Sequence, residues 1–127
     1  MTPAPILLIE DNEQNRYLVT FLLEKHGYAV VSAMDGRRGL DLAATMTPSV
    51  VLLDIQLPTM DGYTIAKALR RMPHLDAVPV VAVTSYAMPG DREKAIEAGC
   101  TGYIEKPINP ETFVAEVEAF ITRRDEA

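Results

Sequence analysis

Asp54 is the first residue whose position in the sequence suggests chemistry. It directly follows residues 50–53, Val-Val-Leu-Leu, an apolar run that predicts a strand buried on both faces. An isolated Asp at such a place usually starts a turn or caps a helix through its own local hydrogen bonds. It can also be a nucleophile or a metal ligand, because open α/β sheets carry their chemistry at the carboxyl ends of the strands. The other polar residues of the chain decide between these two interpretations.

Polar residues also follow three other segments with the pattern of strands. They are Glu10 and Asp11 after residues 6–9, Thr84 after residues 80–83, and Lys106 just after residues 102–104. If the strands are parallel, these ends share one edge of the sheet, with about 5 Å between neighbours. The carboxylates of Glu10, Asp11 and Asp54 can then meet, and their mutual repulsion needs compensation. A hard divalent cation with oxygen ligands, most simply Mg²⁺, would provide it.

The elements that must position these residues alternate along the chain. Strands are predicted at residues 6–9, 29–33, 50–54, 80–83 and 102–104. Helices are predicted between Asn12 and Gly27, Gly36 and Pro48, Gly62 and Pro73, Pro89 and Gly99, and Asn109 and Ile121. This alternation predicts a parallel sheet with helices on both faces. We expect one doubly wound α/β domain over residues 1–127, with its core at about 6–121 and frayed ends at 1–4 and 123–127.

The first and last helices carry more specific predictions. Asn12 is expected to cap the first helix, and Asn109 to open the last one with Pro110 in its first position. The predicted face of the first helix comprises Leu18, Leu22 and Lys25 along one side, widened by Tyr17 and Phe21. The predicted core stripe of the last helix comprises Phe113, Val117, Phe120 and Ile121.

The charge and cysteine content exclude several classes of function. The 127 residues carry a formal net charge of −6, which argues against binding to nucleic acid or anionic membranes. A single cysteine excludes an internal disulfide and a multi-cysteine metal site, and it suits a reducing cytosol. No segment approaches the ~20 apolar residues of a membrane span, and no signal peptide pattern opens the chain. We therefore expect a cytoplasmic protein.

Glu10-Asp11, Asp54, Thr84 and Lys106, in this order and at these strand ends, resemble the response-regulator receiver domain of two-component signalling. The resemblance covers about residues 6–121 and includes residues 55–58 and 60–62 and the Lys106-Pro107 pair. Single-domain receivers of the chemotaxis and cell-division type are most similar, the latter through residues 10–13 and 87–91. The resemblance implies a flavodoxin-like receiver fold with a five-stranded sheet in the order 2-1-3-4-5 and five helices.

The resemblance also implies a role for each residue. Asp54 would be the phosphoacceptor that attacks a phosphohistidine. Glu10, Asp11, Asp54 and the backbone carbonyl of Gln56 would hold Mg²⁺, with Mn²⁺ as a possible substitute. Lys106 would pair with a phosphoryl oxygen, and its bond to Pro107 is cis in the family. The hydroxyl of Thr84 would donate to the phosphoryl group, and Tyr103 would be the aromatic switch that turns inward when Thr84 moves.

Each residue taken alone has a simpler structural interpretation. Glu10-Asp11 could be a solvated turn, Lys106 a surface charge, Thr84 a β-branched strand end and Tyr103 a half-buried packing residue. Their joint occurrence with Asp54 favours the functional interpretation. His26 and His74 are expected at the surface without partner acids at ligand spacing, and Cys100 is expected to pack in the interior.

Other classes with related topology or chemistry fit the sequence less well. An FMN carrier would need a phosphate loop after residues 6–9, where this chain has two acids. A dinucleotide-binding domain would need G-x-G-x-x-G there. A phosphatase of the haloacid dehalogenase type would need a second Asp two residues after Asp54, where Gln56 stands. A receiver that has lost phosphorylation would lack one of the acids or the lysine.

We therefore expect a phosphorylation-dependent signalling switch, not a turnover enzyme. Its donor would be a histidine kinase or a histidine phosphotransfer protein. Because the chain ends soon after the last helix, output is expected through protein contacts at the surface of the fourth helix, fifth strand and fifth helix. A receiver module of a hybrid sensor kinase is the alternative. No nucleic acid or membrane partner is expected.

Overall fold

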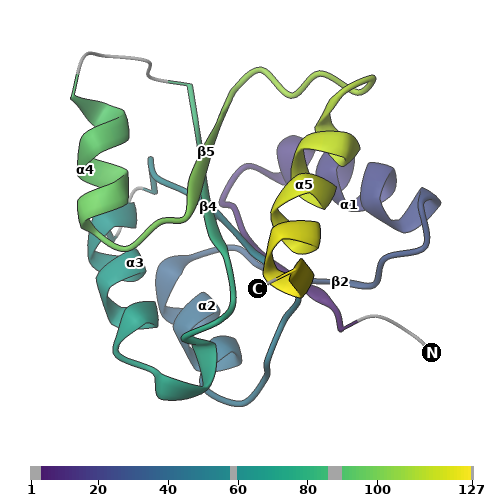
Figure 1. Cartoon of the computed structure of the whole chain (residues 1–127). Coiled ribbons are helices and arrows are strands. Elements are labelled where there is room, and N and C mark those ends of the chain that lie inside the picture. Colours follow the sequence, from purple (N-terminus) through teal and green to yellow (C-terminus); the bar gives the residue numbers. More distant parts are fainter. Residues whose placement is uncertain (1–3, 58–59, 86–89, 127) are drawn as a thin grey trace.

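Five strands form one sheet between two layers of helices (Figure 1). The computed structural model describes residues 4–57, 60–85 and 90–126, with side chains through residue 121. The strands are β1 (Ile6–Ile9), β2 (Val30–Ala33), β3 (Val51–Asp54), β4 (Val80–Thr84) and β5 (Gly102–Glu105). Their order is β2-β1-β3-β4-β5 and the four pairings are parallel. The predicted doubly wound α/β fold and strand order are confirmed.

The register of the sheet brings the polar strand ends together. Every residue of β1, β3 and β4 is buried, because helices cover both faces of these strands. Ile9 pairs with Leu53, so Glu10 and Asp54 stand at the same edge of the sheet. On the other side of β3, Asp54 pairs with Val83, and the following Thr84 pairs with Glu105.

Each face of the sheet has its own helices and its own apolar cluster. The helices are α1 (Glu13–Lys25), α2 (Gly36–Ala43), α3 (Gly62–Arg70), α4 (Asp91–Glu97) and α5 (Phe113–Glu126), with the short 3-10 helix η1 (Pro73–Leu75) after α3. Helices α1 and α5 cover one face and α2, α3 and α4 the other (Figure 1). Over the described ranges, no helix is both long and apolar enough to cross a membrane.

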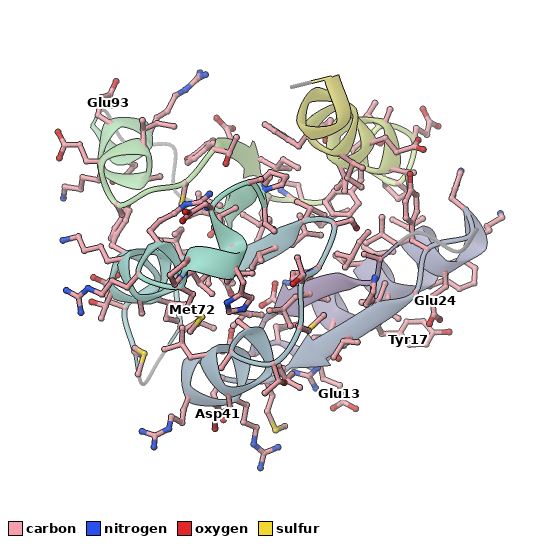
Figure 2. The ribbon with its side chains drawn as sticks, turned by 60° about the horizontal axis from the view of Figure 1, so that its bottom comes forward. Glu13, Tyr17, Glu24, Asp41, Met72 and Glu93 are labelled. Atoms are coloured by element: carbon pink, nitrogen blue, oxygen red, sulfur yellow. The ribbon has the colours of Figure 1, made fainter. Side chains whose placement is uncertain are left out.

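The prediction for the apolar face of α1 is wrong in part, because two of its residues are exposed. The buried residues of α1 are Val19, Leu22 and Leu23. Tyr17 and Phe21 are 73% and 51% exposed, and their rings stack with centroids 6.4 Å apart. Figure 2 shows Tyr17 pointing away from the sheet, on the same side as Glu13 and Glu24. The reason is that each helical residue turns by about 100°, so positions two before and two after Val19 lie on the opposite face.

The predicted start of the last helix is also wrong, because Asn109 opens a separate turn. Its side-chain oxygen accepts from the backbone N–H of Glu111, and its carbonyl accepts from those of Thr112 and Phe113. Helix α5 therefore begins only at Phe113 and is helical through Glu126. The predicted stripe is confirmed, with Phe113 and Val117 buried and Phe120 and Ile121 packed against them. Fraying at residues 123–127 stays a prediction.

Other boundaries agree more closely with the predictions. The Oδ1 of Asn12 accepts from the N–H of Asn15 at 2.9 Å, which confirms the cap of α1. Gly27 follows α1 with φ +92°, the left-handed region that glycine adopts without strain. Helix α2 ends at Ala43, before the predicted limit, and α4 begins at Asp91. Residues 58–59 and 86–89, which belong to the predicted motifs, lie outside the described residues.

Candidate functional site

Three carboxylates converge at the carboxyl edge of the sheet, as predicted. Oxygen atoms of Glu10, Asp11 and Asp54 all lie within 4.8 Å of one another. Glu10 and Asp54 are each only 3% exposed, whereas Asp11 is exposed. The pairing of β1 with β3 explains the convergence, because it places the two strand ends side by side. Such a set of hard oxygen donors fits a divalent cation.

Lys106 completes the cluster from the other side of β3. Its Nζ lies 3.0 Å from Oε1 of Glu10 and 3.3 Å from Oδ2 of Asp54. The backbone N–H of Lys106 donates to the carbonyl of Thr84, which ties the end of β5 to the end of β4. The Lys106–Pro107 bond is cis, as the resemblance implied. The side chain of Lys106 is 13% exposed, so the ion pairs lie largely out of water.

Burial and mutual repulsion change the acidity of this cluster. The pKa of Glu10 is raised from 4.5 to about 7, first by burial and then by the hydrogen bond and negative charge of Asp54. The positive charge of Lys106 partly opposes this shift. Burial alone would lower the pKa of Lys106, but its contacts with Glu10 and Asp54 outweigh burial and raise it. At neutral pH Lys106 is therefore charged, and the carboxyl group of Glu10 is partly protonated.

We expect the metal-free protein to lose stability as the pH rises from about 5 to 8. Because the pKa of Glu10 is about 7 in the folded protein and near 4.5 in the unfolded chain, the folded state binds more protons in this range. Raising the pH then favours unfolding, by about 3 kcal/mol over the full shift. Urea unfolding in EDTA at several pH values measures this slope.

The Glu10→Gln variant should flatten this pH profile, because it removes the titrating group. The matched control is Glu13→Gln, since Glu13 is exposed at the start of α1. It should keep the wild-type slope. A wild-type profile that rises with pH through this range, or an equal slope in Glu10→Gln, would show that Glu10 does not carry the effect.

Backbone and side-chain hydrogen bonds organise the loop after β3. The N–H of Gln56 donates to Oδ1 of Asp54 at 2.9 Å, so Asp54 accepts from both its own loop and Lys106. Gly62 approaches the backbone of Ile55 so closely that an added Cβ would lie 2.5 Å from the Cα of Ile55. Its N–H donates to the carbonyl of Ile55, which closes the loop that carries Gln56.

The side chain of Gln56 makes a contact that the sequence analysis missed. Its Oε1 accepts from the hydroxyl of Ser85 at 2.7 Å and from the N–H of Ser85 at 3.3 Å, which joins the loops after β3 and β4. The only sequence signal was that both residues closely follow strand ends. Gln56, Ser85 and the charged cluster line one open cavity of about 660 Å³ that also includes Asn12, Leu18 and Ile108.

Of the remaining predicted residues, Thr84 lies at this edge, and the others lie elsewhere in the fold. Thr84 is 3% exposed at the end of β4, next to the end of β3. Tyr103 is half-buried on β5 and packs against the apolar cluster beneath α3 and α4. Burial and nearby acids raise the pKa of Tyr103. His26 and His74 are exposed and outside the cluster, and Cys100 is buried.

The sequence of the chain matches a known protein family and several characterised relatives. The family model for the response regulator receiver domain matches residues 6–118. The polar-differentiation response regulator DivK of Brucella anthropi is 38% identical over 119 residues, which cover 94% of this chain and 97% of that protein. The DivK of Brucella ovis is also 38% identical, over 91% of this chain and 94% of that protein.

Solved structures agree with this result. The chemotaxis response regulator CheY4 of Vibrio cholerae matches with a TM-score of 0.89 and 30% identity, over 94% of this chain and 99% of that one. The receiver domain of the sensor histidine kinase PA1611 of Pseudomonas aeruginosa matches with a TM-score of 0.84 and 31% identity, over 98% and 99% of the two chains. That structure has a magnesium ion coordinated in its active-site cleft. Together with the acid cluster around Asp54, this likeness indicates a divalent metal site here.

Proposed function

The chain belongs to the response regulator receiver domain family, and we propose that it is a phosphorylation-dependent switch with Asp54 as its phosphoacceptor. Members of this family are two-component signalling proteins, not turnover enzymes. An oxygen of the Asp54 carboxylate attacks the phosphorus of a phosphohistidine, and the phosphorus–nitrogen bond breaks. The imidazole nitrogen leaves with the electron pair, and Asp54 becomes an acyl phosphate. A histidine kinase or a histidine phosphotransfer protein is the donor.

The cation of this site is Mg²⁺ in our proposal, with Mn²⁺ as a possible substitute. The carboxylates of Glu10, Asp11 and Asp54 and the backbone carbonyl of Gln56 would hold it. When bound, it supplies positive charge that neutralises and orients the oxygens of the transferring phosphoryl group. The donor set supports this choice, because three carboxylates and a carbonyl are ligands that a hard dication prefers.

Lys106, Thr84 and Tyr103 convert phosphorylation into a signal in our proposal. The ammonium of Lys106 exchanges its contact with Asp54 for a phosphoryl oxygen, and the hydroxyl of Thr84 donates to another. Tyr103 then turns inward, which changes the surface formed by α4, β5 and α5, where a target protein binds. Phosphorylation thereby shifts the balance between two conformations that already exist. This output needs no contact with nucleic acid or membrane, and we place the protein in the cytoplasm.

One observation carries the proposal more than any other. The Nζ of Lys106 lies within 3.3 Å of oxygens from both Glu10 and Asp54. Two buried carboxylates beside a lysine rarely stabilise a fold better than apolar packing does. Stability alone therefore does not explain the cluster, which favours a functional role. A receiver that acts only as a binding module would not need this arrangement.

Phosphotransfer profiling tests the proposal. The purified protein is incubated with a panel of radiolabelled histidine kinases and phosphotransfer proteins, with Mg²⁺ or with EDTA. We expect rapid labelling by at least one donor with Mg²⁺ and almost none with EDTA. Labelling that is equal in EDTA would contradict the metal assignment. Absence of labelling by the panel and by acetyl phosphate would contradict the phosphoacceptor assignment.

A receiver module of a hybrid sensor kinase is the second candidate. The likeness to the receiver domain of the PA1611 kinase favours it. The same profiling separates the two candidates. A hybrid module should accept from one kinase core and pass the phosphoryl group on to a phosphotransfer protein, whereas an independent switch should retain it and bind a target.

A further inference from the structure

Glu10 and Asp11 are consecutive residues, and this makes their convergence unusual. In an extended strand, successive side chains point to opposite faces of the sheet. The carboxylates of both residues nevertheless lie within 4.8 Å of each other and of the Asp54 carboxylate. The N–H of Glu10 still donates to the carbonyl of Ala33 in β2, so the backbone leaves the strand only after this bond, just beyond the end of β1 at Ile9. Something must hold this turn, because the backbone carbonyls of an irregular segment have no strand partner.

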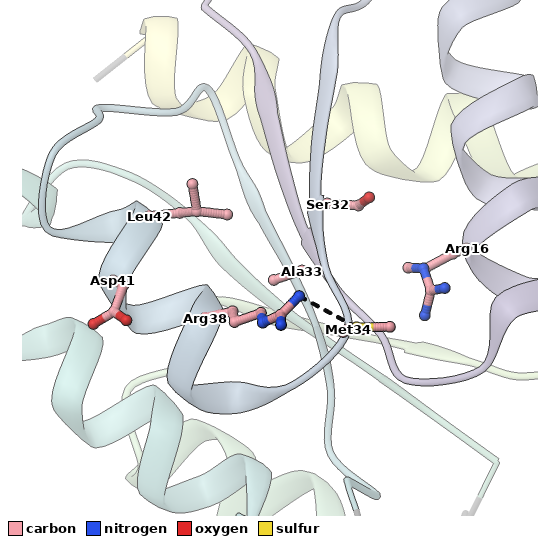
Figure 3. Close-up of a pocket in the computed structure, with 7 residues that line it drawn as sticks. All are labelled: Arg16, Ser32, Ala33, Met34, Arg38, Asp41 and Leu42. Carbon is pink, nitrogen blue, oxygen red and sulfur yellow. Dashed lines mark hydrogen bonds between the residues drawn. The ribbon is translucent and has the colours of Figure 1, made fainter.

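Arg16 supplies that support from the first turn of α1. Its Nη1 donates to the carbonyl of Glu10 and to the carbonyl of Asp11, each at 3.0 Å. One nitrogen thus bonds two successive carbonyls, which can face the same donor only if the chain turns between them. Arg16 also lines a surface cavity of about 410 Å³. Figure 3 shows Arg16 extending from α1 on one side of this cavity and Arg38 and Asp41 of α2 on the other.

The charge of Arg16 has no carboxylate partner within salt-bridge distance among the described residues. Arg37 and Arg38, in contrast, pair with Asp41 and Asp35 at the exposed surface. Arg70 uses the same chemistry as Arg16 at a different place, since its guanidinium donates to the carbonyls of Leu75, Val78 and Gly99. This chain therefore fixes irregular turns by donating arginine N–H groups to backbone carbonyls.

We infer that Arg16 is a positioning residue for the cation site, acting through the backbone of Glu10 and Asp11. By holding both carbonyls, Arg16 keeps the two carboxylates directed toward Asp54 before a cation arrives. Groups that orient metal ligands in this way typically contribute at least tenfold to metal affinity. The inference rests on the proposed function, because it assumes that the acid cluster binds Mg²⁺.

Arg16 has two opposing effects on Mg²⁺ affinity, and two variants separate them. Positioning strengthens Mg²⁺ binding, whereas the positive charge of Arg16 opposes it. Arg16→Met removes both the charge and the hydrogen bonds. Arg16→Lys keeps the charge but ends short of the Nη1 position and lacks the guanidinium fork. If positioning dominates, both variants bind Mg²⁺ more weakly than the wild type.

Calorimetric titration of the full chain with Mg²⁺ tests the inference. We expect about tenfold weaker binding for Arg16→Met and a smaller loss for Arg16→Lys. The matched control is Arg38→Met, because Arg38 lines the same cavity but its side-chain polar contacts among the described residues are with Asp35 and Met34. Its Mg²⁺ affinity should equal that of the wild type. In the metal-free protein, the carbonyl ¹³C shifts of Glu10 and Asp11 should change in both Arg16 variants and not in the control.

Several outcomes would overturn the inference. Unchanged Mg²⁺ affinity in Arg16→Met with a lower melting temperature would make Arg16 merely structural. Tighter binding in Arg16→Met would show that charge repulsion dominates. If Arg16→Met does not fold, Arg16→Lys is the test, and unchanged Mg²⁺ affinity with unchanged carbonyl ¹³C shifts in that variant would overturn the inference. Failure of the wild type itself to bind Mg²⁺ would instead contradict the proposed function, so the two failures are distinguishable.

Discussion

Replacing Asp54 by Asn should abolish phosphorylation of the protein by acetyl phosphate or by a cognate donor in the presence of Mg²⁺. The amide is almost isosteric with the carboxylate, but it has no anionic oxygen to attack phosphorus. Loss of a nucleophile typically lowers the rate by about 10³-fold or more. Labelling followed by mass spectrometry measures this change, and cleavage of the label by hydroxylamine and by alkali identifies an acyl phosphate.

The controls for this variant follow from the geometry of the cluster. Asp76→Asn changes an exposed acid next to η1 and should leave labelling unchanged. The fold of Asp54→Asn should persist, because the pair between Lys106 and Glu10 at 3.0 Å remains. The pKa of Glu10 should fall in this variant, since Asp54 contributes to raising it. Undiminished labelling of Asp54→Asn would place the phosphoacceptor elsewhere, with the exposed Asp11 the first residue to test.

Replacing Lys106 by Ala should separate metal binding from signalling. In the metal-free protein, the Nζ of Lys106 is close to the Glu10 and Asp54 oxygens that a cation would use. Removing this competing charge should leave Mg²⁺ affinity unchanged or several-fold tighter. The change around Tyr103 on phosphorylation should be lost, because no ammonium remains to follow the phosphoryl group. Calorimetry with Mg²⁺ and NMR of the Tyr103 ring, with and without phosphorylation, measure the two effects.

The same variant should be less stable without metal. The carboxylates of Glu10 and Asp54 are each 3% exposed and would lose the ammonium group of Lys106 that pairs with them. Removing one partner of a buried ion pair typically lowers the free energy of unfolding by about 3 kcal/mol. Protonation of Glu10 removes one of the unpaired charges, so the loss of stability in Lys106→Ala should be large at pH 8 and small at pH 5. Lys67→Ala, which changes an exposed lysine of α3, is the matched control. Equal losses of Mg²⁺ binding and of the Tyr103 response would show that Lys106 acts in metal binding and not in signalling.

Much of the fold could be predicted from the sequence because its strands are unusually clear. Residues 6–9, 50–53 and 80–83 are apolar throughout, as is typical of short strands covered on both faces. One helical segment lies between each two successive predicted strands, and parallel strands need a crossover connection of this kind. Helix ends were less predictable, since Asn109 can cap a turn as well as a helix. The outward position of Tyr17 and Phe21 depended on which face Val19 buries, and this is decided by packing.

The sequence by itself determined which residues stand at the ends of the strands, and therefore that Glu10, Asp11, Asp54 and Lys106 share one edge of the sheet. Local patterns suffice for this, because strand polarity fixes the side on which each end emerges. Tertiary structure alone decided the contacts within that edge. The turn held by Arg16, the bond between Gln56 and Ser85 and the burial that raises the pKa of Glu10 join residues from different elements. Their geometry depends on side-chain reach and exclusion of water, which exist only once the helices have packed against the sheet.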